Sequence, residues 1–166
     1  MKKSLSTSVV IPSYNESYYL ERCLQALDSQ TIPPVEVIVV DNNSTDDSIV
    51  RAKKRFPKVI FLEETTQGIV YARNTGFDAA KGDVVAKLDA DTIVHAEWNE
   101  KLHQSIGEAD VWTGYVRNDE LNPFLQGFFN RAMQFLGYRV NSWIIGSQFL
   151  FGSNLAIRRE AWSALR

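Results

Sequence analysis

The sequence predicts an α/β fold with a mostly parallel central sheet that helices cover on both sides. Short apolar runs of strand length alternate with segments whose apolar residues recur at helical spacing. Polar residues follow each predicted strand of the first half, at the edge where such sheets bind ligands. With 166 residues, of which 45% are hydrophobic and 23% charged, the chain is long enough for one globular domain.

The first strand is predicted at residues 8–11, an apolar run that stops at Pro12. A helix is expected to follow over residues 18–30, with Asn15 or Ser17 as its cap. Its apolar residues keep the i, i+3, i+4, i+7 spacing of an amphipathic helix: Leu20, Cys23, Leu24 and Leu27. The single cysteine is therefore expected to be a buried thiol and not part of a disulfide.

The second strand is predicted at residues 35–40 and ends at Asp41. Ser44 and Asp47 resemble a capping box, so the next helix is expected to begin there and to run to about Phe56. Its inward face is expected to consist of Ile49, Ala52 and Phe56.

A third strand at residues 59–62 and a fourth at 83–88 are predicted on either side of a helix over 68–80. That helix carries a face of mostly small residues that can approach a sheet closely: Ile69, Ala72, Gly76 and Ala79. The fourth strand ends at Asp89 and Asp91. Residues i and i+2 project to one side, so both carboxylates can reach one Mg²⁺ or Mn²⁺ ion or one ribose-diphosphate group. Asp-x-Asp pairs also occur where a strand ends in a turn and no ligand is bound, and this alternative stays open.

The second half is less regular, with a helix predicted at 95–107 and a strand at 111–115. His95 and His103 lack the spacing of metal ligands and are expected on the surface.

Residues 124–151 are rich in aromatic side chains and follow a helix start at Asn122. They are expected either to form a core helix and strand or to touch an apolar acceptor or a membrane surface. The formal net charge of −2 excludes the basic field of a nucleic-acid-binding protein. The opening residues lack the apolar run of a secretory signal, so a cytoplasmic location is expected, with the inner face of the membrane as a variant of it.

Five motifs, in this order, resemble family 2 of the nucleotide-sugar glycosyltransferases, and the resemblance covers essentially the whole chain. They are Val-Val-Ile-Pro-Ser-Tyr-Asn-Glu (9–16), Val-Asp-Asn-Asn-Ser-Thr-Asp (40–46), Gly-Ile-Val-Tyr-Ala-Arg-Asn-Thr-Gly (68–76), Leu-Asp-Ala-Asp-Thr (88–92) and Gly-Ser-Asn-Leu-Ala-Ile-Arg-Arg (152–159). The resemblance implies one GT-A domain over 1–166, a Rossmann-like three-layer sandwich. Residues 1–92 would bind the nucleotide sugar, and 93–166 would begin the acceptor-side half.

The resemblance also implies the donor site, residue by residue. Pro12, Tyr14 and Glu16 match the loop that lines the nucleobase and ribose pocket, where the Tyr14 ring offers a face for stacking. Asp41 matches the residue that accepts a hydrogen bond from the base.

The remaining implied site residues belong to the diphosphate and the metal. Arg73 and Asn74 match the segment near the nucleotide, where an arginine suits the charge of a diphosphate. Asp89 matches the ribose-side member of the Asp-x-Asp pair and Asp91 the metal ligand, so both are candidates for holding Mn²⁺ or Mg²⁺. A divalent cation there would stabilise the charge that builds on the departing nucleoside diphosphate.

The implied activity is inverting transfer from a nucleoside-diphosphate sugar, most commonly a UDP-sugar, to a sugar or lipid-linked acceptor. Inversion needs a general base, which the family supplies from an acidic pair after the segment that Gly152, Asn154 and Arg158 match. The chain ends at Arg166 without such a pair, so no catalytic residue is assigned and the chain is expected to be incomplete at its C-terminus.

A non-catalytic module that binds the nucleotide sugar is the second expectation. A sugar-phosphate nucleotidyltransferase or a dinucleotide-dependent oxidoreductase would need a glycine-rich phosphate loop after a strand, and the sequence has none.

Overall fold

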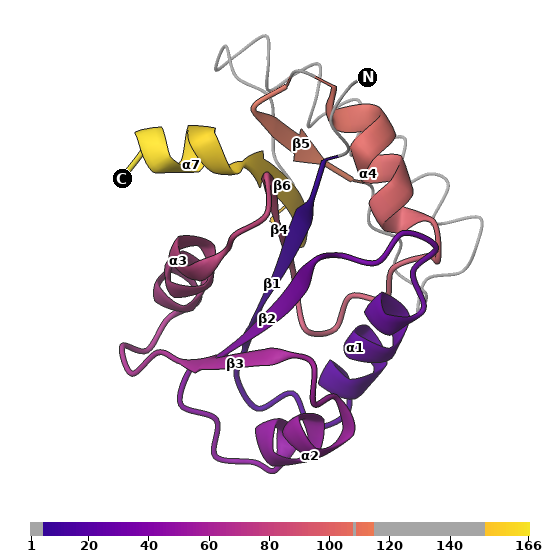
Figure 1. Cartoon of the computed structure of the whole chain (residues 1–166). Helices are drawn as coiled ribbons and strands as arrows, with labels where there is room; N and C mark the ends of the chain where they lie inside the picture. Colours follow the sequence, from indigo (N-terminus) through magenta and orange to yellow (C-terminus); the bar gives the residue numbers. More distant parts are fainter. Residues whose placement is uncertain (1–4, 108, 115–151) are drawn as a thin grey trace, which may run out of the picture.

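The structure is a computed structural model that describes residues 5–107, 109–114 and 152–166. The strands within these residues form one six-stranded sheet. They are β1 (Thr7–Ser13), β2 (Glu36–Asp41), β3 (Ile60–Glu63), β4 (Val84–Leu88), β5 (Val111–Thr113) and β6 (Asn154–Arg158). Their order across the sheet is β3-β2-β1-β4-β6-β5 (Figure 1). The strands β1 to β4 run parallel, whereas β6 is antiparallel to both β4 and β5. The prediction of a mostly parallel sheet is confirmed.

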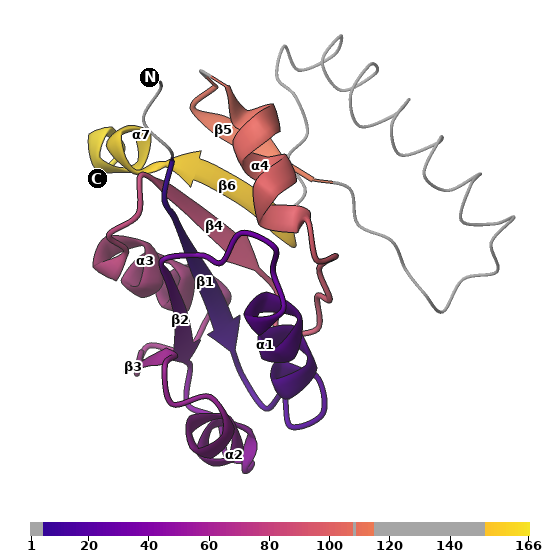
Figure 2. The same ribbon diagram turned by 45° about the vertical axis from the view of Figure 1, so that its right-hand side comes forward.

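Helices cover both faces of this sheet, so the domain has three layers. One face carries α1 (Leu20–Asp28), α2 (Ser48–Arg55) and α4 (Trp98–Ile106), and the other carries α3 (Ile69–Ala79) and α7 (Arg159–Ala164). Figure 1 places α3 and α7 to the left of the strands and α1 and α4 to the right, and Figure 2 shows the same division after rotation.

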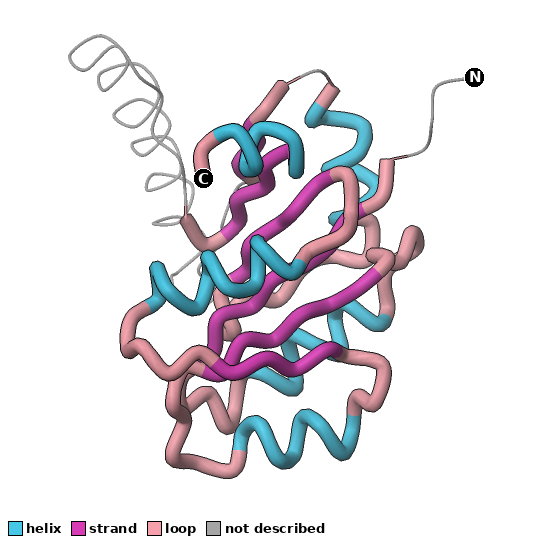
Figure 3. The backbone as a smooth tube through the Cα atoms, turned by 60° about the vertical axis from the view of Figure 1, so that its left-hand side comes forward, coloured by secondary structure: helices cyan, strands magenta, loops and turns pink. Residues whose placement is uncertain are grey.

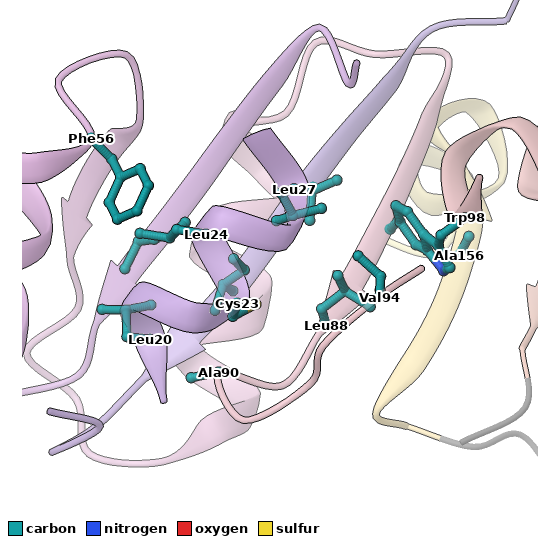
Figure 4. Close-up of a cluster of buried hydrophobic side chains, with 14 of the residues drawn as sticks. Leu20, Cys23, Leu24, Leu27, Phe56, Leu88, Ala90, Val94, Trp98 and Ala156 are labelled. Carbon is teal, nitrogen blue, oxygen red and sulfur yellow. The ribbon is translucent and has the colours of Figure 1, made fainter. Parts of the chain in front are cut away.

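The larger hydrophobic cluster lies between the sheet and α1, α2 and α4 (Figure 4). The four α1 residues predicted to face inward, Leu20, Cys23, Leu24 and Leu27, are each at most 2% exposed, which confirms the helical spacing. Burying a leucine side chain completely contributes about 1.5–3 kcal/mol, so this stripe alone binds α1 firmly to the sheet. Burial also raises the pKa of Cys23 to about 12, so the thiol is an inert part of the core.

The smaller cluster lies under α3, which crosses the strands in front of the sheet in Figure 3. Ala72, Gly76 and Phe77 are buried against it, so the prediction that a face rich in small residues approaches the sheet is confirmed. Ile69 and Ala79, predicted to belong to this face, are exposed. The buried stripe instead includes Phe77, which packs against the indole of α7, a contact that helical spacing within α3 cannot reveal.

The predicted helix caps are wrong. The N-cap of α1 is Tyr19 and that of α2 is Asp47, and neither cap side chain accepts a hydrogen bond from its helix. The side chains expected to cap, those of Asn15, Ser17 and Ser44, bond between the two loops instead. These side chains use their polar atoms for hydrogen bonds between the loops, so they do not cap the helices.

One strand boundary and one whole strand also differ from prediction. β1 continues through Pro12 to Ser13, because its pairing with β4 ends at Val10 and only β2 pairs with it beyond that point. Proline has no amide N–H to donate, and it is tolerated here because no described strand pairs with that side of β1 at this position. β6 was not predicted as a strand, because it depends on antiparallel partners on both sides that are distant in sequence.

The expectation that both histidines lie on the surface holds for His95 and is wrong for His103. The His103 ring is half-buried, and its Nε2 shares a hydrogen bond of 2.7 Å with Oγ1 of Thr7 on β1. Burial lowers the pKa of His103 below its ordinary value, because the charged imidazolium is poorly solvated there.

This shift predicts how stability depends on pH. An imidazole with a lower pKa in the folded state contributes stability above its unfolded pKa of about 6.5, and that contribution is lost as the pH falls below this value. In urea unfolding, the free energy of unfolding of the parent protein should be lower at pH 5.5 than at pH 7.5. This difference should be smaller in the His103→Gln variant. His95→Gln serves as the matched control and should follow the parent; an equal fall in His103→Gln would count against this assignment.

Candidate functional site

A cleft of about 390 Å³ opens at the carboxyl ends of β1, β2 and β4 and at the start of α3. The chain passes from β1 to β2 and β3 on one side, and β4 then pairs with β1 on the other. The loops after β1 and β4 therefore diverge and leave a crevice, which is where open α/β sheets bind ligands. Its volume lies within the usual range for small-molecule sites, about 300–1,000 Å³.

Five of the predicted site residues line this cleft: Pro12, Tyr14, Glu16, Asp89 and Asp91. The first three come from the end of β1 and the other two from the end of β4. Tyr14 is 50% exposed and lines the cleft, so its ring offers an apolar face that a planar ligand can stack on.

Three other predicted site residues do not line the cleft. Asp41, at the end of β2, accepts a hydrogen bond of 2.9 Å from the amide of Ser44 and holds the following turn. Arg73 and Asn74 lie on α3, where the guanidinium donates two bonds of 3.1 and 2.9 Å to the Asn74 amide oxygen.

The loop after β1 is held by Asn15, which adopts a left-handed conformation (φ 56°) that asparagine tolerates better than most residues. Its side-chain oxygen accepts bonds from the amides of Thr45 and Asp46, at 2.7 and 3.3 Å. Ser17 adds bonds from its amide and hydroxyl to the Asp46 carboxylate. Burial alone would raise the pKa of Asp46, but the bonds from Ser17 and Ser48 outweigh it and lower that pKa. The loop that carries Tyr14 is thereby fixed to the neighbouring loop.

The β4 side of the cleft is acidic. Asp89 forms an ion pair with Lys87, whereas the exposed carboxylate of Asp91 has no hydrogen-bond or ion-pair partner among the described residues. The pKa of Glu16 is raised, first by burial and then by the charges of Asp91, Asp46 and Asp89. The carboxylates of the cleft therefore repel one another and favour a bound cation.

This donor set fits a hard divalent cation that also binds substrate oxygens. Within the described ranges, no three His, Cys, Asp or Glu side chains are grouped so that they could hold a metal ion by themselves. Mg²⁺ and Mn²⁺ prefer oxygen ligands, and Mg²⁺ commonly uses one or two carboxylates together with phosphate oxygens and water. Asp91 and Asp89 could supply the protein's share.

Asn42 was missed as a site residue, because its place after β2 indicated only turn chemistry. It is buried, and its side-chain amide donates bonds of 2.8 Å to the carbonyls of Glu64 and Thr66. Its oxygen accepts a bond of 2.7 Å from the amide of Gly68, the N-cap of α3. Asn42 thus fixes the loop that brings Gln67 and Ile69 to the cleft.

Replacing Asn42 by aspartate should destabilise the fold, because the two N–H donors of the side-chain amide are lost and a carboxylate then faces two carbonyl oxygens. We expect a loss of about 2–3 kcal/mol in free energy of unfolding, measured by urea denaturation. Asn43→Asp is the matched control, since the Asn43 amide also donates two bonds, to Thr65 and Gln67, but at an exposed position where water can replace them; it should cost less than about 0.5 kcal/mol. Equal losses in both variants would show that Asn42 has no special role.

A second hollow of about 350 Å³ lies away from the strand ends, between α1 and α2. Two of its charged groups already pair with each other, as Arg55 binds Glu21 at 2.8 Å, and the guanidinium of Arg22 lies over the Tyr18 ring. In the described part of the chain, no helix combines the length and hydrophobicity needed to cross a membrane.

The sequence profile described as Glycosyl transferase family 2 matches residues 8–166. Glycosyltransferase AglE of Haloferax volcanii is 40% identical over 110 residues, which are 63% of this chain and 36% of AglE. The chain thus matches about a third of the length of that relative.

Solved structures show the same fold. The mannosyltransferase PcManGT of Pyrobaculum calidifontis, in complex with GDP-Man and Mn²⁺, has a TM-score of 0.72 at 24% identity, over 99% of this chain and 47% of that one. S. aureus TarS 1-349 in complex with UDP-GlcNAc has a TM-score of 0.71 at 24% identity, over 97% of this chain and 47% of that one. The predicted GT-A fold is confirmed.

Proposed function

The chain belongs to glycosyl transferase family 2, and on this basis we propose that its cleft binds a nucleoside-diphosphate sugar and a divalent cation for transfer of the sugar to an acceptor. One observation carries the proposal: a half-exposed aromatic ring and two carboxylates of an Asp-x-Asp pair line one cleft at the switch point of the sheet. Such a cleft offers a stacking face to a base and charge to a metal diphosphate.

The nucleoside would lie on the β1 side. Tyr14 would stack on the base, with Pro12 and Glu16 beside it. Asp41 does not line the cleft, so its proposed bond from a base N–H requires the base to reach beyond the cleft lining, to the carboxylate oxygen that does not hold the turn. UDP is our first choice of nucleotide. The neighbouring structures bind UDP-GlcNAc in one case and GDP-Man in the other, so both bases are to be tested.

The diphosphate would lie toward Asp89 and Asp91. Mn²⁺ or Mg²⁺ held there would stabilise the charge of the leaving nucleoside diphosphate. Arg73 and Asn74, from α3, are proposed to act near the diphosphate, which requires the Arg73 guanidinium to leave its bonds to Asn74.

The proposed reaction is a single displacement with inversion. An acceptor hydroxyl oxygen forms a bond to the anomeric carbon while the bond from that carbon to the diphosphate oxygen breaks. The electron pair leaves on the diphosphate, and a general base takes the hydroxyl proton. We assign no residue to this base. A cytoplasmic location, membrane contact by residues 124–151 and a sugar or lipid-linked acceptor stay predictions, and 115–151 lie outside the described residues.

Release of nucleoside diphosphate tests this function. UDP-, GDP- and dTDP-sugars are incubated with the protein, Mn²⁺ and pooled sugar or lipid-linked acceptors. Acceptor-dependent release of one nucleotide is expected. Donor binding without any release would favour the alternative, a module that binds the nucleotide sugar and does not transfer it. Absence of binding as well would contradict the donor site itself.

A further inference from the structure

Lys87 is a buried lysine directly below the acidic edge of the cleft. Its side chain is 7% exposed, and lysine is almost never buried without a partner. Ala86 and Leu88 face the cluster under α1 and α4, whereas Val85 faces the cluster under α3, so Lys87 shares the α3 side with Val85.

The partner of Lys87 is Asp89, the first carboxylate of the Asp-x-Asp pair. The two residues are two positions apart at the end of β4, so their side chains project to the same side and the ammonium reaches Oδ1 of Asp89. The Asp89 side chain is 33% exposed and still lines the cleft with its outer part. One carboxylate of the pair is therefore both charge-compensated and fixed in direction.

The second carboxylate, Asp91, is in a different state. It is exposed, and among the residues that the structure describes no cation or donor contacts it. A dication close to Asp89 would be repelled by the Lys87 ammonium a few ångströms behind it, whereas one close to Asp91 would meet no such charge.

We propose that Lys87 is a positioning residue for Asp89: its ammonium fixes the direction of that carboxylate and compensates its charge, and in this way keeps apart the ribose role that the motif resemblance implies for Asp89 and the metal role that it implies for Asp91. This inference rests on the proposed function of the cleft. On this proposal Asp91 binds the cation and Asp89 is not a metal ligand. Lys87 was missed in the sequence because it lies inside an otherwise apolar strand.

Lys87→Met tests the proposal, because it keeps the length of the side chain and removes the charge. Mn²⁺ binding is measured without nucleotide by the loss of the free-ion EPR signal, and uridine binding is measured by calorimetry. We expect Mn²⁺ affinity to rise about tenfold, the change that corresponds to about 1.4 kcal/mol, as Asp89 becomes available to the ion. Uridine affinity should fall by a similar factor, because Asp89 is no longer held toward the ribose.

A positioning role predicts that Lys87→Met raises Mn²⁺ affinity and lowers uridine affinity. A purely structural role of Lys87 would instead lower both affinities. Lys101→Met, an exposed lysine on α4, is the matched control and should change neither. An Mn²⁺ affinity that is unchanged or lower in Lys87→Met would overturn the proposal.

A double variant covers the case in which Lys87→Met does not fold. Lys87→Met with Asp89→Asn removes both charges, and its Mn²⁺ affinity should stay within about threefold of the parent, since Asp91 is intact. Loss of Mn²⁺ binding in the double variant would show that Asp89 is a metal ligand and would overturn the proposal. A parent protein that binds neither Mn²⁺ nor UDP would instead contradict the proposed function itself.

Discussion

Asp91→Asn is expected to remove the metal-dependent part of nucleotide binding while the fold stays intact. The exposed Asp91 carboxylate has no partner among the described residues, so the substitution costs little stability. It takes away the one uncompensated charge that the β4 end offers to a cation. We expect UDP affinity in Mn²⁺ to fall about 100-fold, or about 2.7 kcal/mol, and UDP affinity without metal to change little. Calorimetric titration of the variant with and without Mn²⁺ measures both.

Asp28→Asn is the matched control for Asp91, because Asp28 is also exposed but lies at the end of α1, away from the cleft. It should bind UDP as the parent does. An Asp91→Asn variant that retained Mn²⁺-dependent UDP binding would place the cation elsewhere.

Gly76→Ala is expected to destabilise the fold, because α3 leaves no room for a Cβ where it lies against the sheet. A Cβ at this position would lie 2.3 Å from Cγ1 of Val10 and 3.0 Å from Cγ2 of Val40, distances at which α3 or the strands must shift. Alanine is the better helix former by about 1 kcal/mol, but overpacking typically costs about 1–3 kcal/mol and this contact is at the severe end. We expect a net loss of about 2 kcal/mol in urea unfolding.

Two further variants identify the cause. Val10→Ala removes the clashing methyl groups, so Gly76→Ala should cost less in that background than in the parent, and the double-mutant cycle measures the difference. Gly152→Ala places its Cβ where no atom of the described residues, apart from its chain neighbours, lies within 4 Å, and it should be close to neutral. If Gly76→Ala were as neutral as Gly152→Ala, α3 would not approach the sheet as closely as described.

The fold was predictable wherever local pattern and tertiary burial agree. The apolar runs at β1, β2 and β4 have the length of a buried strand and are bounded by turn residues, and the spacing of Leu20, Cys23, Leu24 and Leu27 is fixed by the period of the helix. Helix starts were not predictable, because serine and asparagine can bond to a distant loop as well as to their own helix. Asn15 does so, since its partners lie on the loop after β2.

The site was predictable where it depends on strand ends. Tyr14 and Asp91 are far apart in sequence, and the parallel order of β1 and β4 brings both to one cleft. Asn42 and Lys87 were not predictable as site residues, because their roles depend on buried contacts. An amide that holds three backbone groups and an ammonium that holds one carboxylate leave no periodic signal in a sequence.

A donor site at the β1 and β4 strand ends is tested by calorimetric titration of UDP, GDP and dTDP into the protein, with and without Mn²⁺. One nucleotide is expected to bind with micromolar affinity in Mn²⁺ and much more weakly without it, and Tyr14→Ala is expected to weaken the interaction in both conditions. Failure of all three nucleotides to bind, or binding that ignores both Mn²⁺ and Tyr14, would contradict a donor site at the β1 and β4 strand ends.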